Sequence, residues 1–210
     1  MIISAKRQFA FVHIPKTGGT SFARAYEDRA AADDILIGDT PKARKRKKRL
    51  EQLEAPGRLW KHSRLVDVGG LVPADYFVCT LVRNPWDRMV SYYHWLQVQT
   101  FQHPAVSIAQ SKDFKSFLRD PCVQRAERQN PASNYVTTLE GVLQCDAFIR
   151  LEHPSDYEAA WDHLGFSLSI PHLNQSVRDR DWRNYYDDED IVIVANLAAA
   201  DIARFGYHPE

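Results

Sequence analysis

Two stretches of this chain share the order of a buried strand, a polar loop and a helix. The β-prone run 9–14 precedes a polar loop and the helix-prone segment 20–31. The run 76–82 leads into the segment 84–98, where Asn84 followed by proline indicates a helix start. Strands that read as continuous apolar runs are typical of a parallel sheet covered by helices. An α/β fold with a mostly parallel sheet flanked by helices is therefore expected.

Weaker signals place the remaining elements. A short strand is expected at 58–62 and another at 146–152, with a turn at Gly69-Gly70 between the two main units. Three further helices are expected, at 113–120, 154–165 and 188–204. No internal repeat and no Ser/Gly linker interrupts the 210 residues, so one domain over 1–210 is predicted.

Composition limits the function classes. The 27 basic and 27 acidic residues cancel, so no global field attracts polyanions and any electrostatic specialisation must be local. Cys79, Cys122 and Cys145 are widely spaced and are expected to be free thiols of a reducing compartment. Apolar runs are too short for a signal segment or a membrane span, so a cytoplasmic location is predicted.

The loop after the first strand is rich in groups that bind anions. Glycines let the backbone approach an anion, lysine adds charge, and hydroxyl groups donate hydrogen bonds. The lysine precedes the glycines, whereas the Walker pattern of nucleotide loops places it after them. An alternative is a tight turn that merely needs glycine. The candidate anion ligands are Lys16, Thr17, Gly18, Gly19, Thr20 and Ser21.

The loop after the second strand offers a second anion site. Arg83 stands at the strand end, and Ser91 returns to nearly the same face of the following helix as its cap. In an α/β fold, ligands bind beyond the carboxyl ends of the strands, so the two sites predict a ligand with two anionic groups. Alternatively, Arg83 pairs with Asp87 and Ser91 is simply a small helix residue.

The segments "HIPKTGGTS" (13–21) and "RNPWDRMVSYYHW" (83–95) together resemble the Golgi-type carbohydrate sulfotransferases and their bacterial relatives, the group that includes heparan sulfate 2-O-sulfotransferase. The resemblance implies a P-loop-like fold and the sulfuryl donor 3′-phosphoadenosine 5′-phosphosulfate (PAPS). It also implies that the first loop holds the 5′-phosphosulfate and that Arg83 and Ser91 hold the 3′-phosphate. No metal is expected.

Sulfuryl transfer to a hydroxyl needs charge stabilisation and a base. Lys16 suits the first task. His62 is the predicted base, because the resemblance places a catalytic histidine in its segment. His13 is a rival that is better explained as a core histidine, and Glu54 is a third candidate. The remaining histidines are expected to be surface or structural residues.

The late segment "PHLNQS" (171–176) resembles a loop that folds over the nucleotide, which makes Asn174 and Ser176 candidate ligands; an ordinary polar turn is the alternative. The aromatic residues that follow are expected to pack rather than to stack on adenine. They are Trp182, Tyr185 and Tyr186.

The run "PKARKRKKR" (41–49) carries seven positive charges and is either a solvated face or an attractor of an acidic partner. For Lys42–Arg49 the candidate partners are an acidic glycan, a glycolipid or an anionic membrane surface; no nucleic acid is expected. The leading function is a sulfotransferase acting on a carbohydrate or glycolipid hydroxyl. A small-molecule kinase and a non-enzymatic anion- or nucleic-acid-binding protein are the alternatives.

Overall fold

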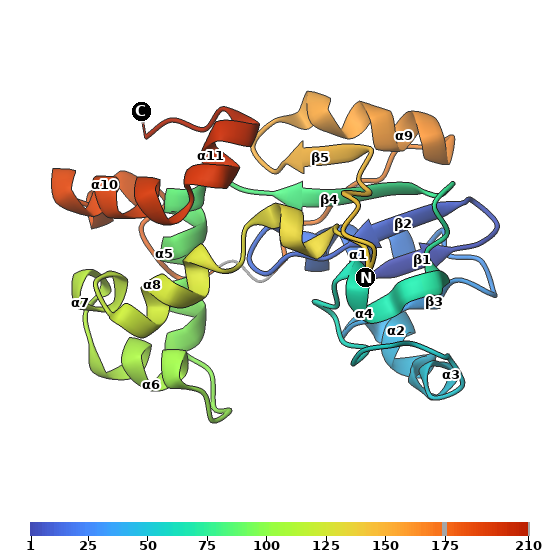
Figure 1. Cartoon of the computed structure of the whole chain (residues 1–210), viewed down its shortest axis with the longest axis horizontal. Coiled ribbons are helices and arrows are strands. Elements are labelled where there is room, and N and C mark those ends of the chain that lie inside the picture. Colours follow the sequence, from blue (N-terminus) through green and yellow to red (C-terminus); the bar gives the residue numbers. More distant parts are fainter. Residues whose placement is uncertain (174–175, 210) are drawn as a thin grey trace. The chain divides into compact units, whose positions relative to one another are not determined.

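A computed structural model describes residues 1–173 and 176–209 (Figure 1). The chain divides into two compact units. The first unit contains residues 1–82 and 132–173, and the second contains the remainder. The single domain expected over 1–210 stays a prediction.

A five-stranded sheet forms the centre of the first unit, in the order β3-β1-β2-β4-β5. Strands β2, β4 and β5 run parallel, β1 is antiparallel to both β2 and β3, and so four strands point the same way. This confirms the expected mostly parallel sheet. The strands are β1 Ile2–Ser4, β2 Phe9–Val12, β3 Ile35–Leu36, β4 Phe77–Val82 and β5 Ala147–Arg150.

Two helices of the first unit pack aromatic side chains on one face of β2. The side chains of Phe9 and Phe11 lie on the same face of the strand, because successive side chains of a strand alternate between its two faces. The Phe11 ring stacks on Phe22 of α1 (Gly19–Glu27), with 4.1 Å between centroids. Phe22 in turn stacks on Trp161 of α9 (Glu158–Leu164), at 5.9 Å. This aromatic layer anchors α1, and therefore the loop before it, to the sheet.

The other elements of the first unit are short. A buried carboxylate organises one of them: Glu27 accepts hydrogen bonds from the backbone N–H groups of Lys42 and Ala43, and so caps α2. The expected strand at 58–62 is wrong, because this segment forms a turn. The short helices are α2 Pro41–Lys45, α3 Lys47–Leu50 and α4 Leu65–Val68, with 3-10 turns at Gly69–Leu71, Ala132–Tyr135 and Pro154–Tyr157.

The second unit is helical in its described residues. Asn84 accepts hydrogen bonds from the N–H groups of Trp86 and Asp87, which confirms it as the cap of α5. The helix expected at 188–204 is two helices, because Ala198 separates α10 from α11. The helices are α5 Pro85–Gln97, α6 Pro104–Ser111, α7 Phe114–Leu118, α8 Pro121–Arg128, α10 Asp188–Leu197 and α11 Ala199–Phe205, with a 3-10 turn at Trp182–Tyr185.

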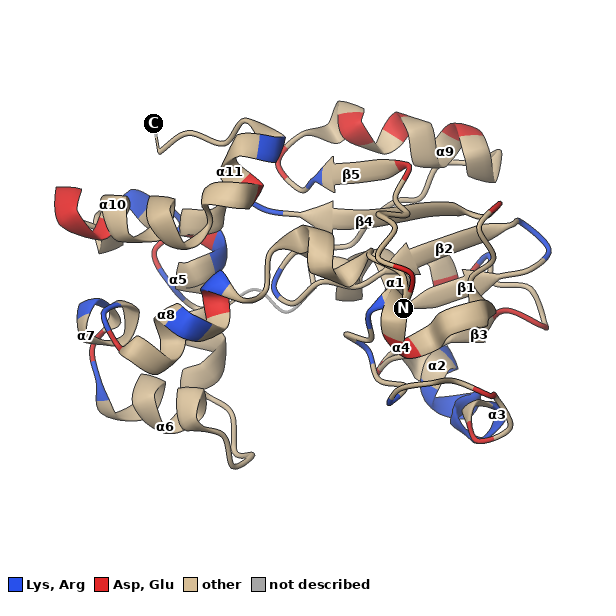
Figure 2. Ribbon diagram, viewed as in Figure 1, with Lys and Arg blue, Asp and Glu red and all other residues tan. Residues whose placement is uncertain are grey.

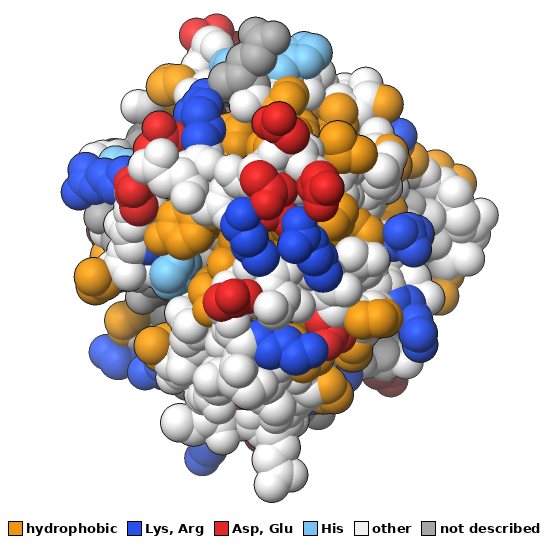
Figure 3. Space-filling model, turned by 90° about the vertical axis from the view of Figure 1, so that its left-hand side faces the viewer, with side chains coloured by type: hydrophobic (Ala, Val, Ile, Leu, Met, Phe, Trp, Pro, Cys, Tyr) orange, Lys and Arg blue, Asp and Glu red, His pale blue; other side chains and the backbone are white. Residues whose placement is uncertain are grey.

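Charged side chains of both signs meet on the face of the second unit that carries α7 and α10 (Figure 3). Lys115 pairs with Asp187 at 2.6 Å, and Arg119 pairs with the buried Asp190 at 2.9 Å. These ion pairs connect α7 to the first turn of α10. Within residues 1–173 and 176–209, no helix is long and apolar enough to cross a membrane.

Candidate functional site

The loop between β2 and α1 has the backbone shape of an anion site. Lys16 and Gly18 both adopt left-handed conformations, with φ of 66° and 86°. Such a conformation is rare for a residue with a side chain and is characteristic of functional loops. Alternation into the left-handed region turns successive N–H groups toward one concavity, which is the arrangement that binds phosphate-like groups.

The N-terminus of α1 is open to an anion. The N-cap residue, Gly18, has no side chain with which to cap the helix, and the first turn contains no acidic residue. The partial positive charge of a helix N-terminus favours an anion there. Among the predicted ligands Thr20 is half-buried, whereas Thr17 is buried and its hydroxyl donates to the carbonyl oxygen of Ile14 at 2.9 Å. The Thr17 hydroxyl thus stabilises the loop itself.

Gly19 is required by close packing. A Cβ atom added at this position would lie 2.1 Å from the Cδ2 atom of His13, far closer than real contacts allow. The His13 imidazole therefore packs directly beneath the first residue of α1. His13 is 6% exposed, as expected for a core histidine.

His62 is joined to the residue that precedes the anion loop. Its Nδ1 atom lies 2.9 Å from the carbonyl oxygen of His13, and the two rings meet edge to face with centroids 4.5 Å apart. Burial lowers the pKa of His62 from 6.5 to about 4 and that of His13 well below 6.5. Both rings are neutral at pH 7. The third candidate base, Glu54, is exposed.

The late segment reaches α1 at its first turn. The backbone N–H of Leu173 donates to the Ser21 hydroxyl oxygen at 3.2 Å. Asn174, the next residue and a predicted ligand, lies outside the described residues. Ser176 is half-buried. The Leu173 contact brings the start of this segment to the anion loop, as a segment that folds over a ligand requires.

In the second unit, Asp87 lies between two arginines. Arg83 donates to its Oδ2 atom from Nε at 2.8 Å and from Nη2 at 2.6 Å, and Arg178 donates to Oδ1. The alternative pairing of Arg83 with Asp87 is therefore present. The Arg178 side chain is 9% exposed, and its buried Nη1 atom has no hydrogen-bond partner in the described part of the chain.

Two guanidinium groups, of Arg83 and Arg178, thus face the carboxylate of Asp87. Burying a charge is costly unless an opposite charge compensates it. The Nη1 atom of Arg178, which has no partner among the described residues, therefore suits an additional anion. Ser91, the other predicted ligand of this site, is 6% exposed on α5.

Arg178 was missed by the sequence analysis. It stands among other charged residues in "VRDRDWR" (177–183), where nothing distinguishes it from its neighbours. The aromatic residues after it pack on α5, as expected. The Trp182 ring stacks on Trp86 at 6.0 Å, and the Tyr186 hydroxyl donates to the Trp86 carbonyl oxygen at 2.8 Å.

The basic side chains of the run 41–49 fall into two groups, those that hydrogen-bond to the backbone and those that are exposed. Several of its side chains donate to backbone carbonyl groups: Lys42 to Glu27, Arg46 to Asp34 at 2.9 Å and Arg49 to Ala32 at 2.5 Å. Its other basic residues are exposed and form the basic surface of α2 and α3 (Figure 2). They are Arg44, Lys45, Lys47 and Lys48.

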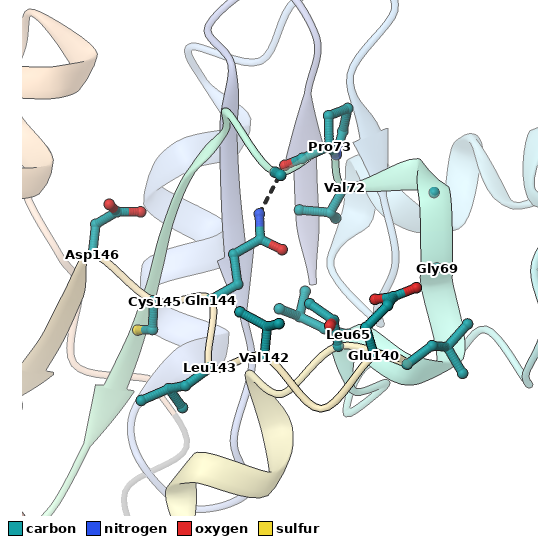
Figure 4. A pocket seen from close by; sticks show the side chains of 14 residues that line it. Leu65, Gly69, Val72, Pro73, Glu140, Val142, Leu143, Gln144, Cys145 and Asp146 are labelled. Carbon is teal, nitrogen blue, oxygen red and sulfur yellow. Dashed lines mark hydrogen bonds between the residues drawn. The ribbon is translucent and has the colours of Figure 1, made fainter.

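A pocket of about 580 Å³ lies elsewhere in the first unit (Figure 4). Its walls include Pro73, just before β4, and Asp146, just before β5. Strands β2, β4 and β5 are parallel. This pocket therefore lies at the N-terminal ends of the strands, whereas the anion loop lies at their C-terminal ends. It contains none of the predicted site residues. Within the described ranges, no three His, Cys, Asp or Glu side chains are grouped to hold a metal ion.

Comparisons with known proteins identify one family for this chain. The family model described as "Sulfotransferase family" matches residues 1–164. No curated protein matches the chain. Among solved structures, mouse sulfotransferase SULT7A1 complexed with PAP matches at 16% identity, over 97% of this chain and 87% of that chain, with a TM-score of 0.47.

Proposed function

This chain belongs to the sulfotransferase family and is by that membership a PAPS-dependent enzyme, and we propose that it sulfates a hydroxyl group of a carbohydrate or glycolipid. The bond from sulfur to the bridging oxygen of the phosphosulfate breaks, and a bond from sulfur to the acceptor oxygen forms. The acceptor proton passes to a base. The products are the sulfated acceptor and adenosine 3′,5′-bisphosphate (PAP).

The shape of the first loop carries the proposal. The left-handed backbone at Lys16 and Gly18, followed by the N-terminus of α1, would present N–H groups and a cation to an anion. We assign the 5′-phosphosulfate to this loop. Lys16 would stabilise the charge that develops on the bridging and sulfuryl oxygens, since a fixed cation acts strongly where charge appears in the transition state. Gly19, Thr20 and Ser21 would contribute donors at the same place.

His62 is the proposed base, and its hydrogen bond defines which nitrogen acts. A carbonyl oxygen can only accept, so the Nδ1 atom of His62 carries a hydrogen and donates to His13. The Nε2 atom is then the proton acceptor. The pKa of His62 is lowered to about 4. Before the sulfuryl donor binds, the imidazole is therefore in the neutral form that a base requires at pH 7. A bound anionic donor would raise that pKa and strengthen the base.

The 3′-phosphate is assigned to Arg83 and Ser91, and Arg178 is added to them. The buried Nη1 atom of Arg178, which has no hydrogen-bond partner among residues 1–173 and 176–209, supports this assignment. Asn174 and Ser176 stay predicted contacts of the nucleotide, which the hydrogen bond between Leu173 and Ser21 supports for this segment.

An acidic acceptor is supported by the exposed part of the basic run. Arg44, Lys45, Lys47 and Lys48 are exposed and could attract a uronic-acid or sulfated glycan, or an anionic membrane that carries a glycolipid. A cytoplasmic location remains part of the proposal.

Ligand-dependent stabilisation tests the donor directly. PAP should raise the melting temperature of the protein more than ATP with Mg²⁺ at the same concentration, because a ligand stabilises the state that it binds. Transfer of labelled sulfate from PAPS to hydroxylated glycans, glycolipids and phenols then tests the acceptor. Preference for Mg-ATP would contradict the donor assignment, and labelling of phenols alone would contradict the proposed acceptor.

A further inference from the structure

The turn that contains His62 also holds an exposed tryptophan in a defined place. The Ser63 hydroxyl oxygen accepts a hydrogen bond from the backbone N–H of Trp60 at 2.8 Å, and the N–H of Ser63 donates to the Trp60 carbonyl oxygen at 2.9 Å. Ser63 is completely buried, so the backbone N–H and carbonyl groups of Trp60 are both hydrogen-bonded to a buried residue. Trp60 itself is 45% exposed.

The indole ring lies beside the candidate base. The centroids of the Trp60 and His62 rings are 5.1 Å apart, and the ring planes are 86° apart. The two rings therefore meet edge to face and do not stack. A ligand that lies on the exposed indole would have its rim close to the imidazole of His62.

The exposure of Trp60 does not by itself mark it as a binding residue. Burial of an apolar side chain contributes roughly 25 cal/mol per Å² of area removed from water, and a tryptophan left 45% exposed forgoes part of that contribution. A single exposed apolar residue is common on protein surfaces. An aromatic residue on an immobilised turn, in contact with a candidate base, is the arrangement used for recognition, because little conformational entropy is lost on binding.

We propose that Trp60 is the platform on which the sugar ring of the acceptor lies, with a hydroxyl group of that ring directed to His62. A pyranose ring has an apolar face of C–H groups and a rim of hydroxyl groups. The C–H face matches the indole, and the rim matches the adjacent base. This inference rests on the proposed function and deepens it, since it selects a saccharide ring over an alkyl or peptide hydroxyl.

Saturation-transfer NMR in the presence of PAP tests the platform. The probes are methyl β-D-glucopyranoside, methyl β-D-glucuronoside and lactosylceramide in micelles, which separate free sugars from a glycolipid head group. In the wild type, the protons of one C–H face of the bound sugar should receive the strongest saturation. Trp60→Ala should weaken binding by about tenfold, which corresponds to ~1.4 kcal/mol. Trp60→Phe should recover part of the affinity.

Phe101→Ala is the matched control, because Phe101 is 47% exposed and lies in the second unit. It should bind the sugars like the wild type. Two results would overturn the inference: no probe binds the wild type, or sugar binding is unchanged in Trp60→Ala. The melting temperature shift caused by PAP is recorded on the same samples. If PAP causes no shift in the wild type, the proposed function is contradicted. If the shift is present but no sugar binds, only the platform is contradicted.

Discussion

The Nδ1 atom of His62 lies 2.9 Å from the carbonyl oxygen of His13, the first residue after β2. This contact connects the candidate base to the beginning of the anion loop. Because the His13 ring also packs beneath Gly19, one buried histidine supports both the base and the first residue of α1. The proton acceptor and the donor loop are therefore held by the same part of the core.

His62→Gln should abolish most of the turnover while leaving the nucleotide site intact. The glutamine amide can still donate to the His13 carbonyl oxygen, but it cannot take a proton from an acceptor hydroxyl. Turnover should fall by roughly 10² to 10⁴-fold, the usual contribution of a general base, and PAP affinity should change little. Steady-state kinetics and calorimetric titration measure the two effects. His153→Gln, at an exposed histidine, is the control; full turnover in His62→Gln would place the base elsewhere.

The stability of the protein should fall as the pH drops from 7 toward 5. Unfolded His62 binds a proton with a pKa near 6.5, whereas the folded group does so only near pH 4, so the unfolded state holds more protons between these values. The buried His13 acts in the same direction. Urea unfolding at pH 7 and 5 measures the loss. His62→Gln should flatten this dependence, and an unchanged slope would argue against a buried neutral His62.

Gly19→Ala should destabilise the fold because its methyl group would collide with the His13 ring, at 2.1 Å from the Cδ2 atom. Overpacking of this kind costs about 1–3 kcal/mol. The midpoint of urea unfolding reports the change. Gly70→Ala is the matched control, since a Cβ atom there would meet no atom within 4 Å from any described residue beyond its chain neighbours. Equal stability of the two variants would contradict the packing of His13 beneath α1.

Lys16→Gly should separate the charge of this residue from its backbone strain. Glycine adopts the left-handed conformation without steric cost, so the melting temperature should stay equal or rise. Turnover should fall by about 10² to 10³-fold, as when a donor to transition-state charge is removed. Gln8→Gly is the control, because Gln8 also has a positive φ, of 47°, in the β1–β2 turn. Retained turnover in Lys16→Gly would remove Lys16 from catalysis.

Arg178→Ala should weaken binding of PAP but not of adenosine 5′-monophosphate, which lacks the 3′-phosphate. Loss of a charge-assisted hydrogen bond costs about 1.5–3 kcal/mol, or roughly 10 to 100-fold in affinity. Arg83→Ala should show the same selectivity. Calorimetric titration with both nucleotides measures it. Arg180→Ala, at an exposed arginine, serves as the control. An equal loss of affinity for both nucleotides would mean that Arg178 does not bind the 3′-phosphate.

The sequence was sufficient for features that depend on neighbouring residues. The apolar runs predicted β2, β4 and β5. Asn84 was recognised as a cap because a cap contacts only the next few N–H groups. Strands β1 and β3 escaped prediction, since two or three residues carry no detectable period and such strands form only by pairing with the sheet.

Tertiary structure decided the contacts that define the candidate site. The segment 58–62 resembled a strand, but the buried hydroxyl of Ser63 bends it into the turn that presents Trp60 and His62. His62 and His13 are 49 residues apart, and Arg178 and Asp87 are 91 residues apart. Local spacing encodes a strand, a cap or a loop. It contains no information on which distant side chain will compensate a buried charge or orient a ring, because that depends on how the whole chain packs.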